Sequence, residues 1–374
     1  MSGIYIHIPF CKQACHYCDF HFSTTTGKKQ EMVLAIQKEL ELRKDEFLEE
    51  KVKTIYFGGG TPSLLETEEI TAILNTVCQH YNVVDKPEIT LEANPDDLSD
   101  EKLKALSETP INRLSIGIQS FLEEDLKLMN RAHSEEEAVT SITKATQLFD
   151  NISIDLIYGM PNMDEERWRQ NIKKALSFKV AHISSYALTV EPKTALASFV
   201  KKGTVSIPSD AVSKAHYYIL LEEMEKAGYV CYEFSNFGLP GYFSENNTAY
   251  WLGKKYLGIG PSAHSYDGRR RGWNINSNPK YIKAIFNGEL PMEVEILSKA
   301  DQYNEYIMTG LRTIWGVSLT KIRLEYGEKY YAYLLEQGKK HLQDKFLKIE
   351  DTTLVVTKKG KFLSDGIASD LFLV

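Results

Sequence analysis

The first half of the chain alternates between short apolar runs and longer amphipathic stretches. Six runs rich in β-branched and aromatic residues predict strands, because each is followed by glycine, proline or polar residues. These runs are Ile4–Ile8, Thr54–Phe57, Ile89–Glu92, Arg113–Ile118, Ile152–Tyr158 and His182–Leu188. Strands that alternate with helices at this spacing predict right-handed β–α–β units in a parallel sheet.

Apolar residues at helical spacing predict helices between these strands. The predicted helices are Lys29–Glu49, Thr67–Tyr81, Asp100–Glu108, Leu122–Met129, Glu135–Leu148 and Glu165–Phe178. Ser99 precedes the third helix, and Ser134 with Glu137 has the spacing of a capping box. Six units are fewer than the eight of a closed barrel. We therefore predict an α/β fold with a partial (β/α)6 barrel.

The end of the chain has a different pattern. Helical stretches and a β pair follow one another at Tyr303–Arg312, Leu319–Glu325, Lys329–Lys340, Leu347–Glu350, Thr353–Val356 and Lys358–Leu371. Helices followed by a short hairpin predict a small, mainly helical, winged-helix-like domain. We accordingly divide the chain into a barrel (1–240), a connecting segment (241–300) and a C-terminal domain (301–374). Such modules often bind DNA, but this one has no clear basic stripe, so a lid or a protein-docking surface is favoured.

Composition and charge narrow the class of protein. The 374 residues are 43% hydrophobic and 25% charged, which is typical of a soluble globular enzyme. A net charge of −7 argues against nucleic acid as a partner. We find no secretory-signal pattern and no apolar run long enough to span a membrane. Of five cysteines three are clustered, which favours a cytoplasmic, metal-binding protein over a disulfide-bonded one, and Cys78 is predicted to be core.

Chemically active residues are concentrated where the predicted strands end. In a parallel β/α barrel, the carboxyl ends of the strands build the site. Here they lead to a cysteine loop, to Gly58-Gly59-Gly60-Thr61-Pro62, and to Glu92, Gln119, Asp155, Tyr186 and Ala187. The glycines indicate either a tight turn or close backbone approach to a ligand. A carboxylate in an apolar run, such as Asp155, needs a partner or a ligand. These groups would converge on one cavity.

The cysteine loop holds Cys11, Cys15 and Cys18 at C-x3-C-x2-C spacing. Thiolates favour zinc, copper(I) or iron–sulfur clusters. Structural zinc sites and fully protein-ligated clusters take four ligands, so three thiols leave one iron of a four-iron cluster open. Alternatively, His16 or His21 could complete a zinc site. The spacing alone leaves both interpretations open.

These motifs together resemble the radical S-adenosylmethionine (SAM) superfamily. The strings Ile-Tyr-Ile-His-Ile-Pro-Phe-Cys, Ile-Gly-Ile-Gln-Ser-Phe and Ile-Asp-Leu-Ile-Tyr-Gly-Met-Pro are similar to the anaerobic coproporphyrinogen III oxidase-like family. The resemblance implies a [4Fe–4S] cluster on Cys11, Cys15 and Cys18, with SAM on the fourth iron. It implies SAM contacts from Tyr5, Gly58, Gly59 and Glu92, and a second SAM held by Tyr17, Gly60, Thr61, Gln119, Arg131, Asp155 and Ala187. The match to a SAM pocket favours the cluster over zinc.

The residues after Cys18 distinguish two branches of this family. The true oxidase has a further cysteine two residues after the third, whereas this chain has Asp19 and Phe20. The ending Cys-Asp-Phe resembles the HemW branch of heme chaperones. That implies heme as cargo, a heme-accepting apoprotein as partner, a link to homodimers and at most peripheral membrane association. The alternative is an enzyme: SAM-dependent oxidative decarboxylation of coproporphyrinogen III propionates to protoporphyrinogen IX.

The chain departs from the HemW pattern at one position. The branch carries His-Asn-x-x-Tyr-Trp, and its histidine is implicated in heme binding. The corresponding stretch here is Asn246-Asn247-Thr248-Ala249-Tyr250-Trp251. An asparagine amide is a poor iron ligand compared with imidazole. His264 is either a structural residue or a substitute ligand, and the sequence favours a structural role.

Overall fold

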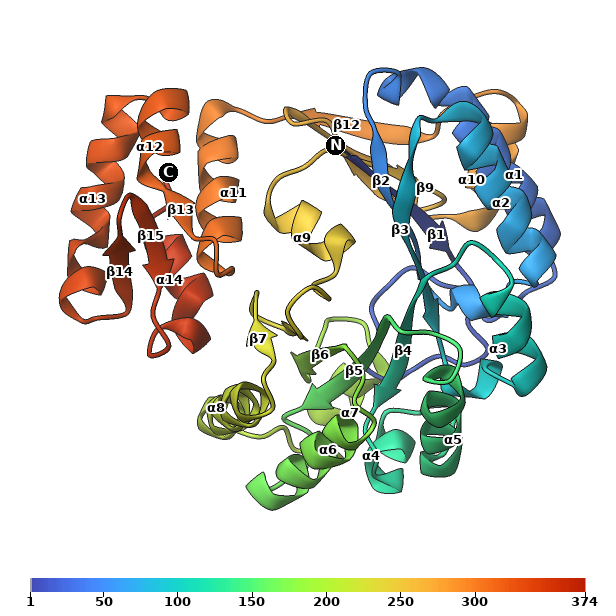
Figure 1. The fold of residues 1–374 in the computed structure, drawn as a ribbon, viewed down its shortest axis with the longest axis horizontal. Coiled ribbons are helices and arrows are strands. Elements are labelled where there is room, and N and C mark those ends of the chain that lie inside the picture. The colour runs from blue at the N-terminus through green and yellow to red at the C-terminus, as the bar shows by residue number, and fades with distance from the viewer. Residues whose placement is uncertain (1, 374) are drawn as a thin grey trace.

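The fold is dominated by one large sheet, seen in a computed structural model that describes residues 2–373 (Figure 1). Six neighbouring parallel strands run in chain order through this sheet. They are β1 (Ser2–Ile8), β2 (Val52–Gly59), β3 (Val83–Ala93), β4 (Arg113–Gln119), β5 (Ile152–Tyr158) and β6 (His182–Ala187). The predicted partial (β/α)6 barrel is confirmed.

Helices lie on the outer side of these strands (Figure 1). They are α1 (Lys29–Leu42), α2 (Thr67–His80), α3 (Asp100–Ser107), α4 (Glu123–Leu128), α5 (Glu135–Ala145) and α6 (Glu165–Ser177). The first ends seven residues before its predicted end at Glu49, because a 3-10 turn follows at Lys44–Phe47. The predicted capping box of Ser134 and Glu137 is present.

One prediction about the helices is wrong. Cys78 is exposed rather than part of the core. On α2 the buried stripe is formed by Ile70, Ile73, Leu74 and Val77. Cys78 follows Val77 around the helix and lies outside the stripe, so its spacing from Leu74 was a poor guide to burial.

The sheet continues beyond both of its parallel edges. After β6 come α7 (Ala195–Lys201), α8 (Asp210–Lys226), β7 (Val230–Cys231) and β8 (Asn236–Gly238), the last antiparallel to β6. Residues 241–300 extend the β1 edge with α9 (Glu245–Trp251), β9 (Tyr256–Ile259), β10 (His264–Tyr266), β11 (Arg270–Asn274), α10 (Asn278–Phe286) and β12 (Met292–Ile296). The predicted connecting segment is thus built into the sheet, with β9 parallel to β1.

A buried carboxylate joins this segment to the barrel. Glu39 of α1 is fully buried and accepts hydrogen bonds from Tyr281 Oη at 2.6 Å and Asn274 Nδ2 at 2.7 Å. The Gly260 N–H donates to it at 2.8 Å, and Arg43 Nη1 lies 3.0 Å away. A buried charge is tolerated only when it is paired and hydrogen-bonded, so this network fixes residues 258–281 against α1.

The C-terminal module has a separate hydrophobic core, which includes Tyr303, Ile307, Leu334 and Leu354. Its elements are α11 (Lys299–Leu311), β13 (Val317–Ser318), α12 (Leu319–Lys321), a π-helical turn (Ile322–Tyr326), α13 (Glu328–Gln343), β14 (Leu347–Glu350), β15 (Thr353–Val356), a 3-10 turn (Lys361–Leu363) and α14 (Ser364–Asp370). The helices and hairpin match the predicted winged-helix-like pattern. In Figure 1, α9 lies between this module and the barrel.

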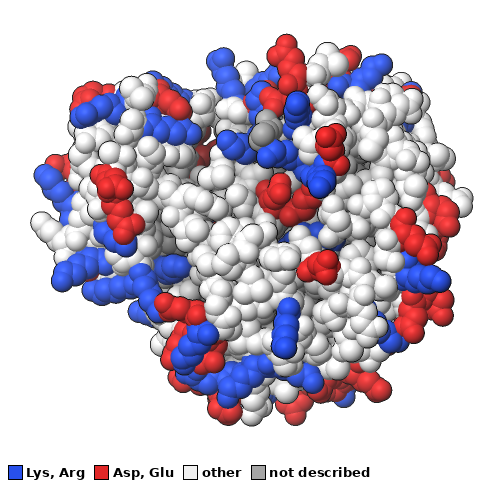
Figure 2. Space-filling view, in the orientation of Figure 1, with Lys and Arg blue, Asp and Glu red and all other residues white. Residues whose placement is uncertain are grey.

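Charge is distributed without a dominant sign. On the face shown in Figure 2, lysine and arginine are interspersed with aspartate and glutamate, and no continuous basic stripe is visible. Within residues 2–373, none of the helices is both long and apolar enough to cross a membrane.

Candidate functional site

The cysteine loop connects β1 to α1 and is closed at its base by backbone hydrogen bonds. The Ser23 N–H donates to Pro9 O at 2.9 Å, and the Cys11 N–H donates to Ser23 O at 3.1 Å. Cys11, Cys15 and Cys18 are all half-buried free thiols. The loop therefore presents three sulfurs from one short, closed stretch of backbone beside the ends of the parallel strands.

Two hydrogen-bond donors approach these sulfurs. Thr61 Oγ1 donates to Cys11 Sγ, and Arg131 Nη1 donates to Cys15 Sγ, each at 3.4 Å. Burial raises the pKa of Cys11, and it raises that of Cys18 to about 11. A coordinating metal deprotonates a thiol outright, and donors of this kind favour the thiolate once it is formed. The donor set fits a thiolate-ligated metal group.

Neither histidine of the zinc interpretation turns toward the cysteines. His16 Nδ1 lies 2.8 Å from Leu128 O, and its ring packs edge-on against Phe199. His21 Nε2 lies 2.7 Å from Asn278 Oδ1. Nowhere in residues 2–373 do three His, Cys, Asp or Glu side chains gather around a point that could hold one metal ion. Neither histidine is therefore placed to complete a zinc site with the three thiols.

The glycine triplet at the end of β2 packs tightly against protein. A Cβ on Gly60 would lie 2.6 Å from Phe10 O, and one on Gly59 would lie 2.5 Å from His7 Nδ1. Gly59 also has a φ of +109°, which side chains rarely adopt. A Cβ on Gly58 would meet Tyr5 and Glu92 at 2.9 and 3.1 Å. The triplet is therefore required by the packing of β1 and the cysteine loop, whatever ligand it also contacts.

Two carboxylates with raised pKa values face this end of the sheet. Glu92 accepts from Tyr56 Oη at 2.8 Å and from the Gly59 N–H at 3.2 Å. Burial raises the pKa of Glu92 to about 7 and that of Asp155 to about 6. The charge of Arg113 acts in the opposite direction on both pKa values, and that of Arg131 on Asp155, but burial outweighs them. A cationic ligand group would relieve this burial cost.

Arg131 is the main cation of the site. Its Nη2 donates to Asn94 Oδ1 at 2.6 Å and to Gly117 O at 2.8 Å. A Cβ on Gly117 would meet both Gln119 Nε2 and Arg131 Nη2, at 2.8 and 3.2 Å, so these two side chains converge above the strand. Gln119 itself has a φ of +65°, an unusual conformation for a residue other than glycine.

The remaining predicted residues lie at the same end. Tyr5 stacks on Tyr56, with ring centroids 6.0 Å apart. Burial raises the pKa of Tyr17, and the nearby charge of Arg131 offsets only part of that rise. Ala187 ends β6 in register with Tyr158. The structure thus brings the predicted cysteines, glycines, carboxylates and Arg131 to the carboxyl end of the parallel strands; their individual contacts to SAM stay predictions.

A cavity of about 1070 Å³ opens beside this site. The barrel contributes Tyr5, His7, Asp19 and Tyr186, so the cavity adjoins the cysteine loop. The far wall includes Tyr250, Trp251 and His264, which the sequence analysis had singled out in connection with heme. It also includes residues that the sequence analysis did not connect with the site: Tyr256, Tyr266, Arg271, Tyr306, Lys321 and Tyr326. The density of aromatic residues in 250–266 and 303–331 is the signal that could have indicated this wall.

His7 lines the cavity, whereas Asn246 does not. His7 faces the cavity side of β1, where its Nε2 lies 2.9 Å from His21 O. Asn246 is 4% exposed, and its Oδ1 accepts from Thr54 Oγ1 at 3.0 Å on β2. Tyr250 and Trp251 of the same motif do line the cavity.

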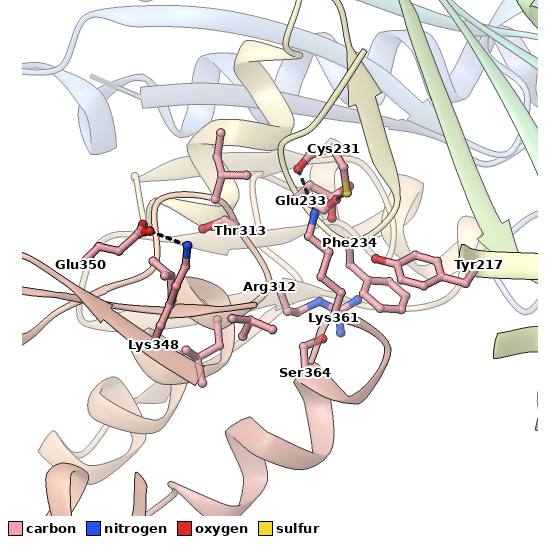
Figure 3. Close-up of a pocket in the computed structure, with 14 residues that line it drawn as sticks. Tyr217, Cys231, Glu233, Phe234, Arg312, Thr313, Lys348, Glu350, Lys361 and Ser364 are labelled. Atoms are coloured by element: carbon pink, nitrogen blue, oxygen red, sulfur yellow. Dashed lines mark hydrogen bonds and ion pairs between the residues drawn. The ribbon is translucent and has the colours of Figure 1, made fainter. Parts of the chain in front are cut away.

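A second, smaller cavity of about 250 Å³ lies between the barrel and the C-terminal module (Figure 3). None of the predicted site residues lines it. Its wall includes Arg312, whose guanidinium lies 5.2 Å from the Phe234 ring centroid and 5.3 Å from that of Trp251. Arg312 also lines the large cavity. It therefore links the module to the barrel through Phe234 and to α9 through Trp251, by one cation–π contact each.

Comparisons with known proteins agree with this geometry. The radical SAM superfamily model matches residues 5–175, and the HemN C-terminal domain model matches residues 297–363. The chain is 34% identical over 376 residues to a heme chaperone HemW from Lactococcus lactis, covering 100% of this chain and 97% of that protein. It is also 34% identical over 375 residues to HemW from Bacillus subtilis, covering 98% of each.

The solved structure of coproporphyrinogen III oxidase (HemN) from Escherichia coli, a radical SAM enzyme, has the same fold. It superposes with a TM-score of 0.85 at 22% identity, covering 99% of this chain and 90% of that one. At this identity the likeness establishes the fold, including the arrangement of sheet and C-terminal module.

Proposed function

Because the chain belongs to the heme chaperone HemW family within the radical SAM superfamily, we propose that it binds a [4Fe–4S] cluster, SAM and heme and delivers the heme to apoproteins. The observation that carries this proposal is the similarity to HemW proteins over the full length of the chain. The Cys18-Asp19-Phe20 ending supports the same branch.

Cys11, Cys15 and Cys18 would hold the cluster as thiolates. Thr61 and Arg131 would donate to the ligating sulfurs, as they do to Cys11 and Cys15 here. When bound, the cluster and SAM supply one-electron and radical chemistry, while the protein supplies orientation and electrostatics. The three-thiol loop leaves one iron for a ligand that is not protein.

The carboxylates and Arg131 would orient SAM by charge. SAM carries an ammonium and a sulfonium as well as a carboxylate. Glu92 and Asp155 are half-buried acids whose pKa values stay raised despite the nearby arginines, so they suit its positive groups. Arg131 suits a carboxylate. The adjoining aromatic cavity would exclude water and hold a flat, apolar macrocycle.

The finer properties of the chaperone are also proposals. We propose that the protein is cytoplasmic, can form a homodimer and associates with membranes at most peripherally. The C-terminal module, which has its own core and an exposed outer face, would provide the surface that contacts the heme acceptor.

Anaerobic reconstitution followed by heme titration tests the proposal. We expect iron and sulfide in a cluster ratio, a shifted Soret band on adding heme, and transfer of that heme to apomyoglobin. A colourless protein that purifies with zinc, or a reconstituted protein that neither shifts the Soret band nor transfers heme, would overturn it. The alternative, coproporphyrinogen III oxidation, predicts SAM-dependent loss of coproporphyrinogen with methionine formed.

A further inference from the structure

The residue at the family's heme-binding position is used structurally in this chain. Besides the hydrogen bond from Thr54, the Asn246 backbone N–H donates to Glu88 Oε1 at 3.0 Å. The same carboxylate accepts from the Glu245 N–H at 3.0 Å. Asn246 is thereby held at the start of α9, turned toward β2 and away from the cavity. An iron ligand for heme must come from another residue.

Three histidines line the large cavity: His7, His21 and His264. His7 is 5% exposed, and both of its ring nitrogens have partners, Tyr5 Oη at 3.3 Å and His21 O at 2.9 Å. His21 has its Nε2 against Asn278. His264 is exposed, and its ring makes no hydrogen bond within residues 2–373. The Trp273 ring lies beside it, with ring centroids 6.2 Å apart.

We propose that His264 is the axial ligand of heme iron in this protein, with the macrocycle seated in the large cavity against the β10–β11 hairpin. The inference rests on the proposed heme-chaperone function. Neutral imidazole is a good iron ligand as it stands. The cavity's tyrosines would each have to lose a proton to ligate iron as phenolates, so a free imidazole ring has the advantage.

The hairpin also supplies a partner for the propionates. In its antiparallel register His264 pairs with Trp273, and Tyr266 pairs with Arg271. Alternate residues of a strand share a face, and His264, Tyr266 and Arg271 all line the cavity. The Arg271 side chain is 40% exposed and lies 2.7 Å from Glu305 Oε1. Its guanidinium can take a carboxylate, so iron ligand and propionate partner come from one rigid element.

Heme titration of the reconstituted full chain tests the ligand. We compare wild type with His264→Ala and His21→Ala, and use His80→Ala as a control because His80 lies in the last turn of α2, away from the cavity. The oxidised cluster is diamagnetic, so electron paramagnetic resonance reports ferric heme alone. We expect His264→Ala to weaken heme binding by about tenfold or more, to lose histidine nitrogen couplings, and to regain them with added imidazole.

Each result is decisive. If wild type binds no heme, the proposed function fails together with this inference. If wild type binds heme and His264→Ala keeps the same affinity and nitrogen couplings, the ligand assignment is wrong and the proposed function stands. If heme affinity and the nitrogen couplings are lost in His21→Ala and kept in His264→Ala, the ligand is His21. Unchanged cluster content in His264→Ala, measured as iron and sulfide per chain, separates loss of a ligand from loss of the fold.

Discussion

Arg131 Nη1 lies 3.4 Å from Cys15 Sγ, so a cation from the loop between α4 and α5 contacts the cysteine loop after β1. The same guanidinium binds Asn94 and the backbone of Gly117. One side chain thus connects the metal-binding loop to two further strand ends of the barrel. This contact couples the two halves of the candidate site.

Replacing Arg131 by methionine should therefore lower cluster occupancy. The substitution removes a charge-assisted hydrogen bond to a thiolate, worth about 1.5–3 kcal/mol, and leaves Asn94 and Gly117 O without their donor. Iron and sulfide per chain after identical reconstitution measure the effect. Arg169→Met is the control, because Arg169 pairs with Glu223 on α8 outside the site. Equal iron content in the two variants would contradict the role assigned to Arg131.

Gly59→Ala should destabilise the protein more than substitutions at other glycines. It adds a Cβ 2.5 Å from His7 Nδ1 at a backbone φ of +109°. Gly288 has a φ of +79° but open space around it, and Gly366 has neither constraint. Chemical unfolding should rank Gly59→Ala as the least stable, Gly288→Ala next at about 1 kcal/mol, and Gly366→Ala near wild type. Equal losses of stability in Gly59→Ala and Gly288→Ala would show that the close packing around Gly59 adds nothing to the cost of its positive φ.

Tyr281→Phe should weaken the attachment of residues 258–281 to α1. It removes the 2.6 Å hydrogen bond from Tyr281 Oη to the buried carboxylate of Glu39. A hydrogen bond to a charged group contributes about 1.5–3 kcal/mol, and urea unfolding should show a loss of that size. Tyr242→Phe, at an exposed tyrosine, should change stability by less than about 0.5 kcal/mol. A loss no larger than that of the control would rule out a structural role for this network.

The contributions of Glu92 and Asp155 to the stability of the ligand-free protein should fall as pH rises from about 4 to 7. Burial raises the folded-state pKa of Glu92 to about 7 and of Asp155 to about 6, both above their ordinary values. The folded state then binds more protons than the unfolded state in this range, so deprotonation favours unfolding. Glu92→Gln removes one such group and should gain on the order of 1 kcal/mol relative to wild type between pH 5 and 8.

Denaturation curves at several pH values check this expectation, with exposed Glu136→Gln as the control. A difference between Glu92→Gln and wild type that stays constant with pH would show that Glu92 has an ordinary pKa. If the cationic groups of SAM bind at Glu92, added SAM should make this carboxylate stabilising as pH rises. That reversal should be seen in wild type and not in Glu92→Gln.

The six parallel strands were predictable because each carries its own apolar run and turn signal. The start of β3 was not. Its residues Val83–Glu88 include Asp85, Lys86 and Pro87, which read as a turn, yet Val83 is paired with Val52 of β2. Pairing with β2 therefore extends β3 to Val83, although the local sequence favours a turn there.

The strand-end residues of the site were predictable, but most of the adjoining large cavity was not. Residues at strand ends follow from the geometry of parallel barrels, so Glu92, Asp155 and the glycines were found. The far wall of that cavity depends in part on β9–β11, which are three to five residues long. They acquire their place because β9 pairs with β1, β10 with β9 and β11 with β10. No local sequence pattern encodes such long-range contacts. The placement of Asn246 outside the cavity could not be predicted for the same reason, because it depends on contacts with Thr54 and Glu88.

Heme transfer tests the account's central claim most directly. Reconstituted protein is loaded with one equivalent of heme, freed of excess, and mixed with apomyoglobin while absorbance is followed. We expect the myoglobin Soret band to develop as the donor band declines, and coproporphyrinogen III to stay unconsumed in a parallel assay with SAM and reductant. Failure to bind or transfer heme, together with SAM-dependent loss of coproporphyrinogen, would contradict it.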